Sequence, residues 1–220
     1  MTASLRNRVF AEFVGTACIV GAPVALSAAG HLPGGDSTLA AAAWVSGLPV
    51  GAMAAALAPW GGAHMNPAVS VALAVSGRFP WRMVPWALLA QLGGAVFASF
   101  LVRVCFGPGA HGVHVPAIPA ANAVGLELVL AFLLTIVVFG ATVHPGHRPS
   151  SIPLVLTVAV VCLVWVGGPA TGGSMNPARS TGPALVSGGD PLRFLWVYWL
   201  GPMLGATLAA LAYRAEYPNR

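Results

Sequence analysis

Two asparagines in this chain stand in nearly the same sequence context and could place hydrogen-bond donors at one point. Asn66 lies within GGAHMNPAVS (residues 61–70), and Asn176 lies within TGGSMNPARS (residues 171–180). The two are 110 residues apart in a chain of 220. Asparagine is a favourable N-cap, and the proline after it suits the first helical position. Each phrase therefore predicts a helix N-terminus, which presents free N–H groups and a partial positive charge.

Three charged side chains stand within or beside apolar runs, where a charge is costly and indicates a function or an internal partner. Arg179 falls in the first turn of the second predicted helix, where the helix dipole disfavours a cation, and the first phrase has Val69 there. Glu12 precedes Asn66 by 54 residues, and Glu127 precedes Asn176 by 49. We expect each carboxylate to accept hydrogen bonds from N–H groups of its own half of the chain. The alternative is a pair of proton sites in a secondary transporter.

Metal and enzyme chemistry have less support in the sequence. The three cysteines lack the CxxC spacing of metal or disulfide motifs, and we expect them to be buried as small apolar side chains. His111 with His114, and His144 with His147, lie in Gly/Pro-rich connections without a third ligand, which predicts solvated loop histidines. The sequence has no HExxH motif and no clear nucleophile–base motif. We therefore expect no metal, no cofactor and no catalytic residues.

The composition indicates that the chain is an integral membrane protein surrounded by lipid. It is 57% hydrophobic and only 7% charged, with a mean hydropathy of +0.82, whereas a soluble domain carries roughly 25% charged residues. A net charge of +5 would suggest a nucleic-acid partner in a soluble protein. Here the arginines cluster at the ends of apolar runs, so we attribute the charge to orientation in the bilayer and expect no nucleic acid.

Six apolar runs approach the roughly 20 residues that a membrane-spanning helix needs. The fifth is short because Gly167, Gly168 and Pro169 are predicted to break it. The six runs cover about residues 8–29, 38–59, 82–105, 121–142, 151–168 and 192–213.

The helices that begin at Asn66 and Asn176 are too short to cross a bilayer. Gly77 is predicted to close the first, and Ser187-Gly188-Gly189 the second. About eleven residues give roughly 16 Å, half of a hydrocarbon core of ~30 Å. Such a half-helix is stable only where its end is buried in protein or lines a watery cavity. We therefore expect two re-entrant half-helices that meet tip to tip, repel cations and offer hydrogen bonds to uncharged, oxygen-bearing solutes.

The two halves of the chain repeat one order of elements: a span with a glutamate, a second span, a half-helix and a span with paired small residues. Because three spans are an odd number, the second half crosses the membrane in the opposite direction. This predicts an all-α membrane protein of one domain over residues 1–220, with inverted repeats of approximately 1–110 and 111–220. The positive-inside rule puts both termini in the cytoplasm. The arginines on that side are Arg6, Arg8, Arg78, Arg82, Arg148, Arg214 and Arg220.

These features resemble the aquaporin, or major intrinsic protein, family, whose pattern is two Asn-Pro-Ala motifs. The likeness covers nearly the whole chain and includes Ala11-Glu12-Phe13 and Asn176-Pro-Ala-Arg-Ser180. It implies an aquaporin-like fold of six tilted helices and two half-helices around one pore, passive transport, and four identical subunits in the bilayer. The motif texture is most similar to the nodulin-26-like group and its bacterial relatives, which implies a bacterial inner membrane.

Alignment with that family implies a constriction outside the paired asparagines. Water-selective members have a bulky aromatic residue and a histidine at its first two positions, where this chain has small residues. The wider opening implies passage of metalloid hydroxides such as boric or arsenous acid, of glycerol and of water, with exclusion of protons and ions. The four positions are Ser46, Val164, Gly173 and Arg179.

Two other positions favour a water-selective channel as the alternative. Ser180 stands where glycerol facilitators have an aspartate, and Tyr198-Trp199 resembles the pattern of water channels.

Overall fold

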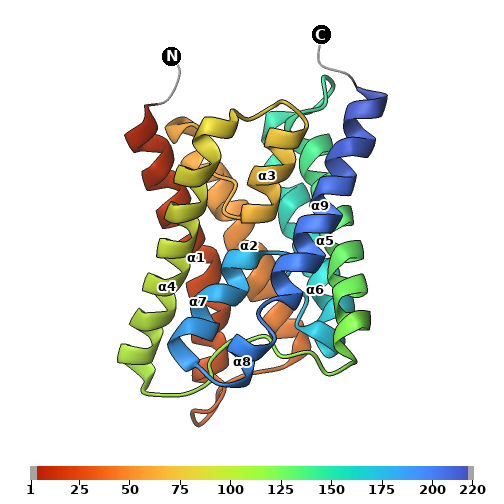
Figure 1. The fold of residues 1–220 in the computed structure, drawn as a ribbon. Coiled ribbons are helices and arrows are strands. Elements are labelled where there is room, and N and C mark those ends of the chain that lie inside the picture. The colour runs from red at the N-terminus through yellow and green to blue at the C-terminus, as the bar shows by residue number, and fades with distance from the viewer. Residues whose placement is uncertain (1–3, 218–220) are drawn as a thin grey trace.

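The computed structural model describes residues 4–217, and all regular structure in that range is helical. Arg220, one of the arginines predicted to lie on the cytoplasmic side, falls outside the described residues. Six long helices run side by side, and the shorter α3 and α7 lie among them (Figure 1). The helices are α1 (Leu5–Ala29), α2 (Leu39–Leu57), α3 (Pro67–Val75), α4 (Val84–Phe106), α5 (Ala120–Thr142), α6 (Ile152–Thr171), α7 (Pro177–Ser187), α8 (Asp190–Arg193) and α9 (Val197–Glu216).

All six predicted spans are present as helices long and apolar enough to cross a membrane. The prediction that the fifth span breaks at Gly167-Gly168-Pro169 was wrong, because α6 continues to Thr171. Pro169 removes one backbone donor only, close to the end of the helix, so the helix tolerates it. The helix ends instead where Gly172 adopts a left-handed conformation with φ of 86°.

Small residues let the long helices pack closely in pairs. α1 packs along α4, α5 along α9, and α2 along α6. A methyl group at Gly94 of α4 would overlap the carbonyl oxygen of Phe13 in α1, and one at Gly205 of α9 would overlap that of Leu128 in α5. The paired glycines of the two halves therefore serve the same purpose, which is close approach of backbones in lipid.

The two half-helices enter the bundle from opposite ends. α3 lies toward the end where α1 begins and α9 finishes, and α7 lies in the other half (Figure 1). Asn66 and Asn176 are their N-caps, as predicted. α7 has 11 residues and ends at Ser187, but α3 has only 9 and ends at Val75, before the predicted stop at Gly77.

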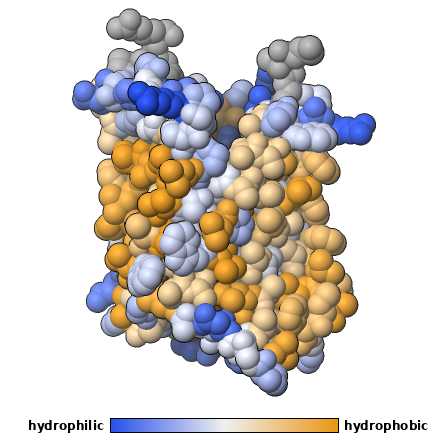
Figure 2. Space-filling model, turned by 180° about the vertical axis from the view of Figure 1, so that it is seen from behind, coloured by the Kyte–Doolittle hydropathy of each residue, from blue (hydrophilic) through white to orange (hydrophobic). Residues whose placement is uncertain are grey.

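The outer surface exposes many large apolar side chains, and on the face shown in Figure 2 apolar residues predominate between two hydrophilic ends. Large side chains such as Leu89, Leu154 and Val166 are exposed there, which suits contact with lipid tails. Cys105 and Cys162 are exposed as well, although we expected buried cysteines. The thiol behaves as a small apolar group, and in lipid such a group has no reason to avoid the surface.

Candidate functional site

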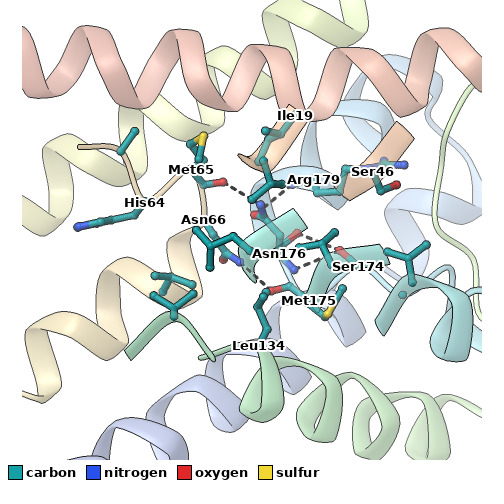
Figure 3. Close-up of a pocket in the computed structure, with 18 of the residues that line it drawn as sticks. Ile19, Ser46, His64, Met65, Asn66, Leu134, Ser174, Met175, Asn176 and Arg179 are labelled. Carbon is teal, nitrogen blue, oxygen red and sulfur yellow. Dashed lines mark hydrogen bonds between the residues drawn. The ribbon is translucent and has the colours of Figure 1, made fainter. Parts of the chain in front are cut away.

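The tips of α3 and α7 meet and exchange hydrogen bonds. The side-chain amide of Asn66 donates to the carbonyl oxygen of Met175 at 2.9 Å, and that of Asn176 donates to Met65 at 2.8 Å. Figure 3 shows both asparagines at the centre of the site. Each Oδ1 accepts from its own half-helix, from Ala68 N at 2.9 Å and Ala178 N at 3.0 Å. Because an amide NH₂ has two hydrogens, one on each asparagine is left over from these contacts.

The residues before the asparagines are held in an unusual backbone conformation. Met65 and Met175 have φ of 56° and 54°, the left-handed region that a side chain disfavours. Such strain costs on the order of 1–3 kcal/mol and persists only where the surroundings impose it. Here the Met65 N–H donates to Glu12 Oε2 at 2.8 Å, and the Met175 N–H donates to Glu127 Oε2 at 2.7 Å. The turned backbone presents each methionine carbonyl to the opposite asparagine.

Each buried glutamate accepts three hydrogen bonds in its own half of the chain. Glu12 accepts from the backbone of His64 and Met65 and from the side chain of Gln91. Glu127 accepts from the backbone of Ser174 and Met175 and from the hydroxyl of Thr171. Both carboxylates thus support the re-entrant loops. Sequence reasoning missed Gln91, which stands in a long apolar helix, and Thr171, the first residue of the second motif phrase, whose role nothing in the phrase indicates.

An elongated cavity of about 310 Å³ passes the meeting point of the two tips. Its lining includes Val143, just beyond the end of α5, and His114, in the connection before α5 begins, so the cavity extends along most of that helix. The four residues of the predicted constriction and both asparagines lie on its wall: Ser46, Asn66, Val164, Gly173, Asn176 and Arg179.

The wall of this cavity is polar on a narrow strip and apolar elsewhere. The strip is formed by the two loops that lead into the half-helices, residues 62–66 and 172–176. Apolar side chains such as Leu134, Val138 and Val160 contribute other parts of the lining. A small solute in the cavity would find hydrogen-bond partners along the strip and at the few polar side chains outside it, among them Arg179 and His114.

Arg179 reaches the cavity wall from the first turn of α7. One guanidinium nitrogen donates to the carbonyl oxygen of Gly112 at 2.7 Å, in the connection between α4 and α5. Among residues 4–217 the guanidinium forms no ion pair with a carboxylate. Its positive charge is therefore uncompensated where it borders the cavity.

His114 was predicted to be a solvated loop residue, and that prediction was wrong. The connection between α4 and α5 folds inward, and the side chain is only 6% exposed. Its Nδ1 lies 2.8 Å from the Ser180 hydroxyl oxygen, and its ring lies 5.2 Å from that of Tyr198. Burial, and after it the charge of Arg179, lowers the pKa of His114 well below its ordinary value. The imidazole is therefore neutral at physiological pH.

The other three histidines of the two pairs, His111, His144 and His147, are partly buried rather than fully solvated. His111 contacts the Gly107 carbonyl oxygen at 3.3 Å, and His147 contacts the His144 carbonyl oxygen at 2.8 Å. Within the described part of the chain, no three His, Cys, Asp or Glu side chains come together in a way that could hold a metal ion.

Comparison with known proteins identifies the family. A family model described as "Major intrinsic protein" matches residues 1–213. The chain belongs to the major intrinsic protein family. The resemblance inferred from the two Asn-Pro-Ala motifs is thereby confirmed.

Several plant members of the family are similar to this chain in sequence. Aquaporin NIP1-1 of Zea mays is 42% identical over 154 residues, which is 69% of this chain and 54% of that protein. Putative aquaporin NIP4-1 of Arabidopsis thaliana is 36% identical over 211 residues, 95% of this chain and 74% of that protein. The chain thus spans between about half and three quarters of the length of these relatives.

A solved structure of an aquaglyceroporin from Plasmodium falciparum has the same fold. The two superpose with a TM-score of 0.87 over 96% of each chain, at 23% sequence identity. At this identity the similarity establishes the fold, and it confirms the predicted fold class of six spanning helices and two half-helices.

Proposed function

We propose that this protein is a passive channel for small uncharged solutes and water, and that it excludes protons and other ions. One observation carries the proposal: a single cavity passes both half-helix tips and then borders Arg179, which forms no ion pair within residues 4–217. The tips repel cations through the dipoles of α3 and α7, and Arg179 adds a full positive charge. Neutral solutes meet neither barrier.

We propose Ser46, Val164, Gly173 and Arg179 as the constriction that selects among solutes. Only the arginine is large, so the opening admits molecules wider than water. The solutes we propose are boric and arsenous acid, glycerol and water. Membership of this family, with NIP-type aquaporins among the relatives, supports the assignment.

The protein is an integral membrane protein, and we propose that both of its termini face the cytoplasm and that four copies assemble, each with its own pore. The arginine distribution supports the first point, and membership of the family supports the second. The two NIP-type relatives are plant proteins and give no support to a bacterial inner membrane, which stays a prediction.

The first test measures whether flux is passive. Reconstituted in vesicles, the protein should let glycerol and boric acid enter at rates that an imposed proton or sodium gradient leaves unchanged. Accumulation against a concentration gradient would contradict a channel and would indicate a transporter that uses Glu12 and Glu127.

The second test narrows the proposed constriction. Ser46→Phe with Val164→His introduces two rings into a packed passage, where overlap is strongly penalised. Glycerol and boric acid entry should fall at least tenfold while osmotic water flux persists. Water is small enough to pass the narrowed opening as a single file of hydrogen-bonded molecules. Light scattering measures both. A parent protein that passes water alone, or a folded double variant with unchanged solute flux, would contradict the proposed constriction.

A further inference from the structure

We propose that His114 is a solute-binding residue of the constriction, and that its Nε2 accepts a hydrogen bond from a hydroxyl group of the passing solute. The proposal deepens the proposed function, because it names a further wall of the same pore and the chemistry of that wall.

His114 reaches the cavity from a segment far from both motif phrases. The inward fold of the connection between α4 and α5 brings it beside Gly172, where a methyl group would overlap the Cδ2 atom of the ring. Gly172 has no side chain, so the histidine ring occupies the space beside it. His114, Gly172, Gly173 and Arg179 all line the cavity. Gly172, the neighbour of Gly173 in the chain, therefore leaves room for a polar ring in the cavity wall.

The hydrogen bonds around the ring determine which nitrogen carries the proton. The Ser174 hydroxyl donates to the carbonyl oxygen of Asn176 at 3.0 Å. A hydroxyl has only one hydrogen, so the 2.6 Å contact between Ser174 and Ser180 must use the hydrogen of Ser180. Ser180 can then only accept from Nδ1 of His114, at 2.8 Å. The neutral ring therefore carries its proton on Nδ1.

Nε2 of His114 consequently carries no hydrogen and can only accept a hydrogen bond, and this atom is not fully buried. No hydrogen bond to it is found among residues 4–217, where the hydrogen bond of the ring is the one that Nδ1 forms with Ser180. The fully buried polar atoms that lack a partner in the described residues are on Thr16, Gln91, His111 and Tyr213, and Nε2 of His114 is not among them. Because His114 lines the cavity, the solute is the group that can reach this lone pair.

A donor and an acceptor then share the constriction. Arg179 has only donors and His114 Nε2 only accepts, so together they match a hydroxyl group, which can accept and donate at once. Boric acid, arsenous acid and glycerol carry several such groups. A solute that fills the opening leaves no room for a substitute water molecule. Loss of the acceptor therefore affects these solutes more than water, which hydrogen-bonds along its own file.

Two variants of His114 separate the acceptor from the shape of the ring. His114→Phe keeps a ring but has no nitrogen. His114→Asn keeps a donor near Ser180 and is too short to reach the cavity with an acceptor. In vesicles, both should reduce glycerol and boric acid permeability by about fivefold to tenfold, the effect of one lost hydrogen bond, and water permeability by less than about twofold. If size alone mattered, the smaller asparagine would increase solute flux.

The tautomer gives a readout that a purely structural role would not change. Nitrogen-15 NMR of the reconstituted protein, with the His114 signals assigned by their loss in His114→Phe, should show a protonated Nδ1 and an unprotonated Nε2. Ser180→Ala removes the acceptor for Nδ1 and should mix the two tautomers. A protonated Nε2 in the parent, or unchanged solute flux in both folded variants, would overturn the proposal. Absence of solute flux in the parent would instead overturn the proposed function.

Discussion

The two re-entrant loops share one support and differ in the histidine that completes it. In the first half, His64 belongs to the motif loop itself, and its Nδ1 lies 3.0 Å from the Ser70 hydroxyl. In the second half the equivalent position is Ser174, and the imidazole that contacts Ser180 comes from His114 instead. A side chain from outside the motif loop thus takes the place of one inside it.

The charge beside the asparagines differs as well. The first half has Val69 in the first turn of its half-helix, and the second has Arg179. The backbone hydrogen bonds to the glutamates are duplicated, whereas Arg179 has no counterpart in the first half, and the contact of the His114 imidazole is made there by His64. We therefore expect the repeated contacts to build the pore and the differences between the halves, Arg179 above all, to give it selectivity.

The largest effect is expected where the halves are alike. Glu12→Ala and Glu127→Ala each leave three hydrogen-bond donors without their acceptor. Each variant should lose about 3–5 kcal/mol of unfolding free energy, since unpaired buried donors cost about 1–3 kcal/mol each. Thermal unfolding in detergent measures this, with the exposed Glu216→Ala as control. A loss below about 1 kcal/mol in either variant would show that its loop does not depend on the carboxylate.

Replacing Arg179 by the residue of the first half tests the difference in charge. Arg179→Val should raise proton and cation conductance about thirtyfold, because a charge ~8 Å away at an effective dielectric of ~20 contributes about 2 kcal/mol to the barrier. Arg179→Lys keeps the positive charge, so this variant should have a proton and cation conductance as low as that of the parent. The measurement is ion conductance of reconstituted vesicles. If the valine variant is as tight as the parent, the half-helix dipoles alone exclude ions.

The reciprocal asparagine contacts predict equal effects in the two halves. Asn66→Ala and Asn176→Ala each remove a helix cap and a hydrogen bond to a methionine carbonyl. Each should lower the unfolding free energy by about 2 kcal/mol. The exposed Asn122→Ala in α5 is the control. Unequal losses would mean that one tip is held by contacts the other lacks.

The smallest effect concerns pH and exists only in the second half. The pKa of His114 is lowered, by burial first and by Arg179 second. The ring therefore stays neutral as the pH falls from 8 to about 6.5, the ordinary pKa of a histidine side chain. Solute flux should be constant over that range and decline only in more acidic buffer, where protonation converts the Nε2 acceptor into a donor and adds charge beside Arg179.

The charged or titratable groups against this ring are Arg179 on α7 and Tyr198 on α9, and neither type changes charge near neutral pH. His114→Phe should therefore show a flat profile in solute uptake assays. A decline that begins near pH 7 in the parent and persists in this variant would assign the titration elsewhere.

The sequence by itself determined the elements and the family. Lipid as solvent follows from composition, and the six spans follow from apolar length. Both half-helices follow from Asn-Pro pairs, because N-capping and the fixed φ of proline are local properties. Glu12, Glu127 and Arg179 could be singled out for the same reason: a charge in an apolar run is visible without a structure. Only the exact ends were missed, as at Pro169, where a proline near a helix end costs little.

Only the tertiary structure decided how the polar groups are paired. His114 looked like a solvated loop residue, since nothing local shows that its Gly-rich connection folds inward onto Gly172. Gln91 looked like an ordinary residue of an apolar helix, and Thr171 like the first residue of the second motif phrase, although each donates to a buried carboxylate. Thr171 lies 44 positions along the chain from Glu127, and Gln91 lies 79 positions from Glu12. His114 and Ser180 are separated by 66 positions. Hydrogen bonds between such distant residues depend on how the helices pack, and local sequence patterns do not encode that packing.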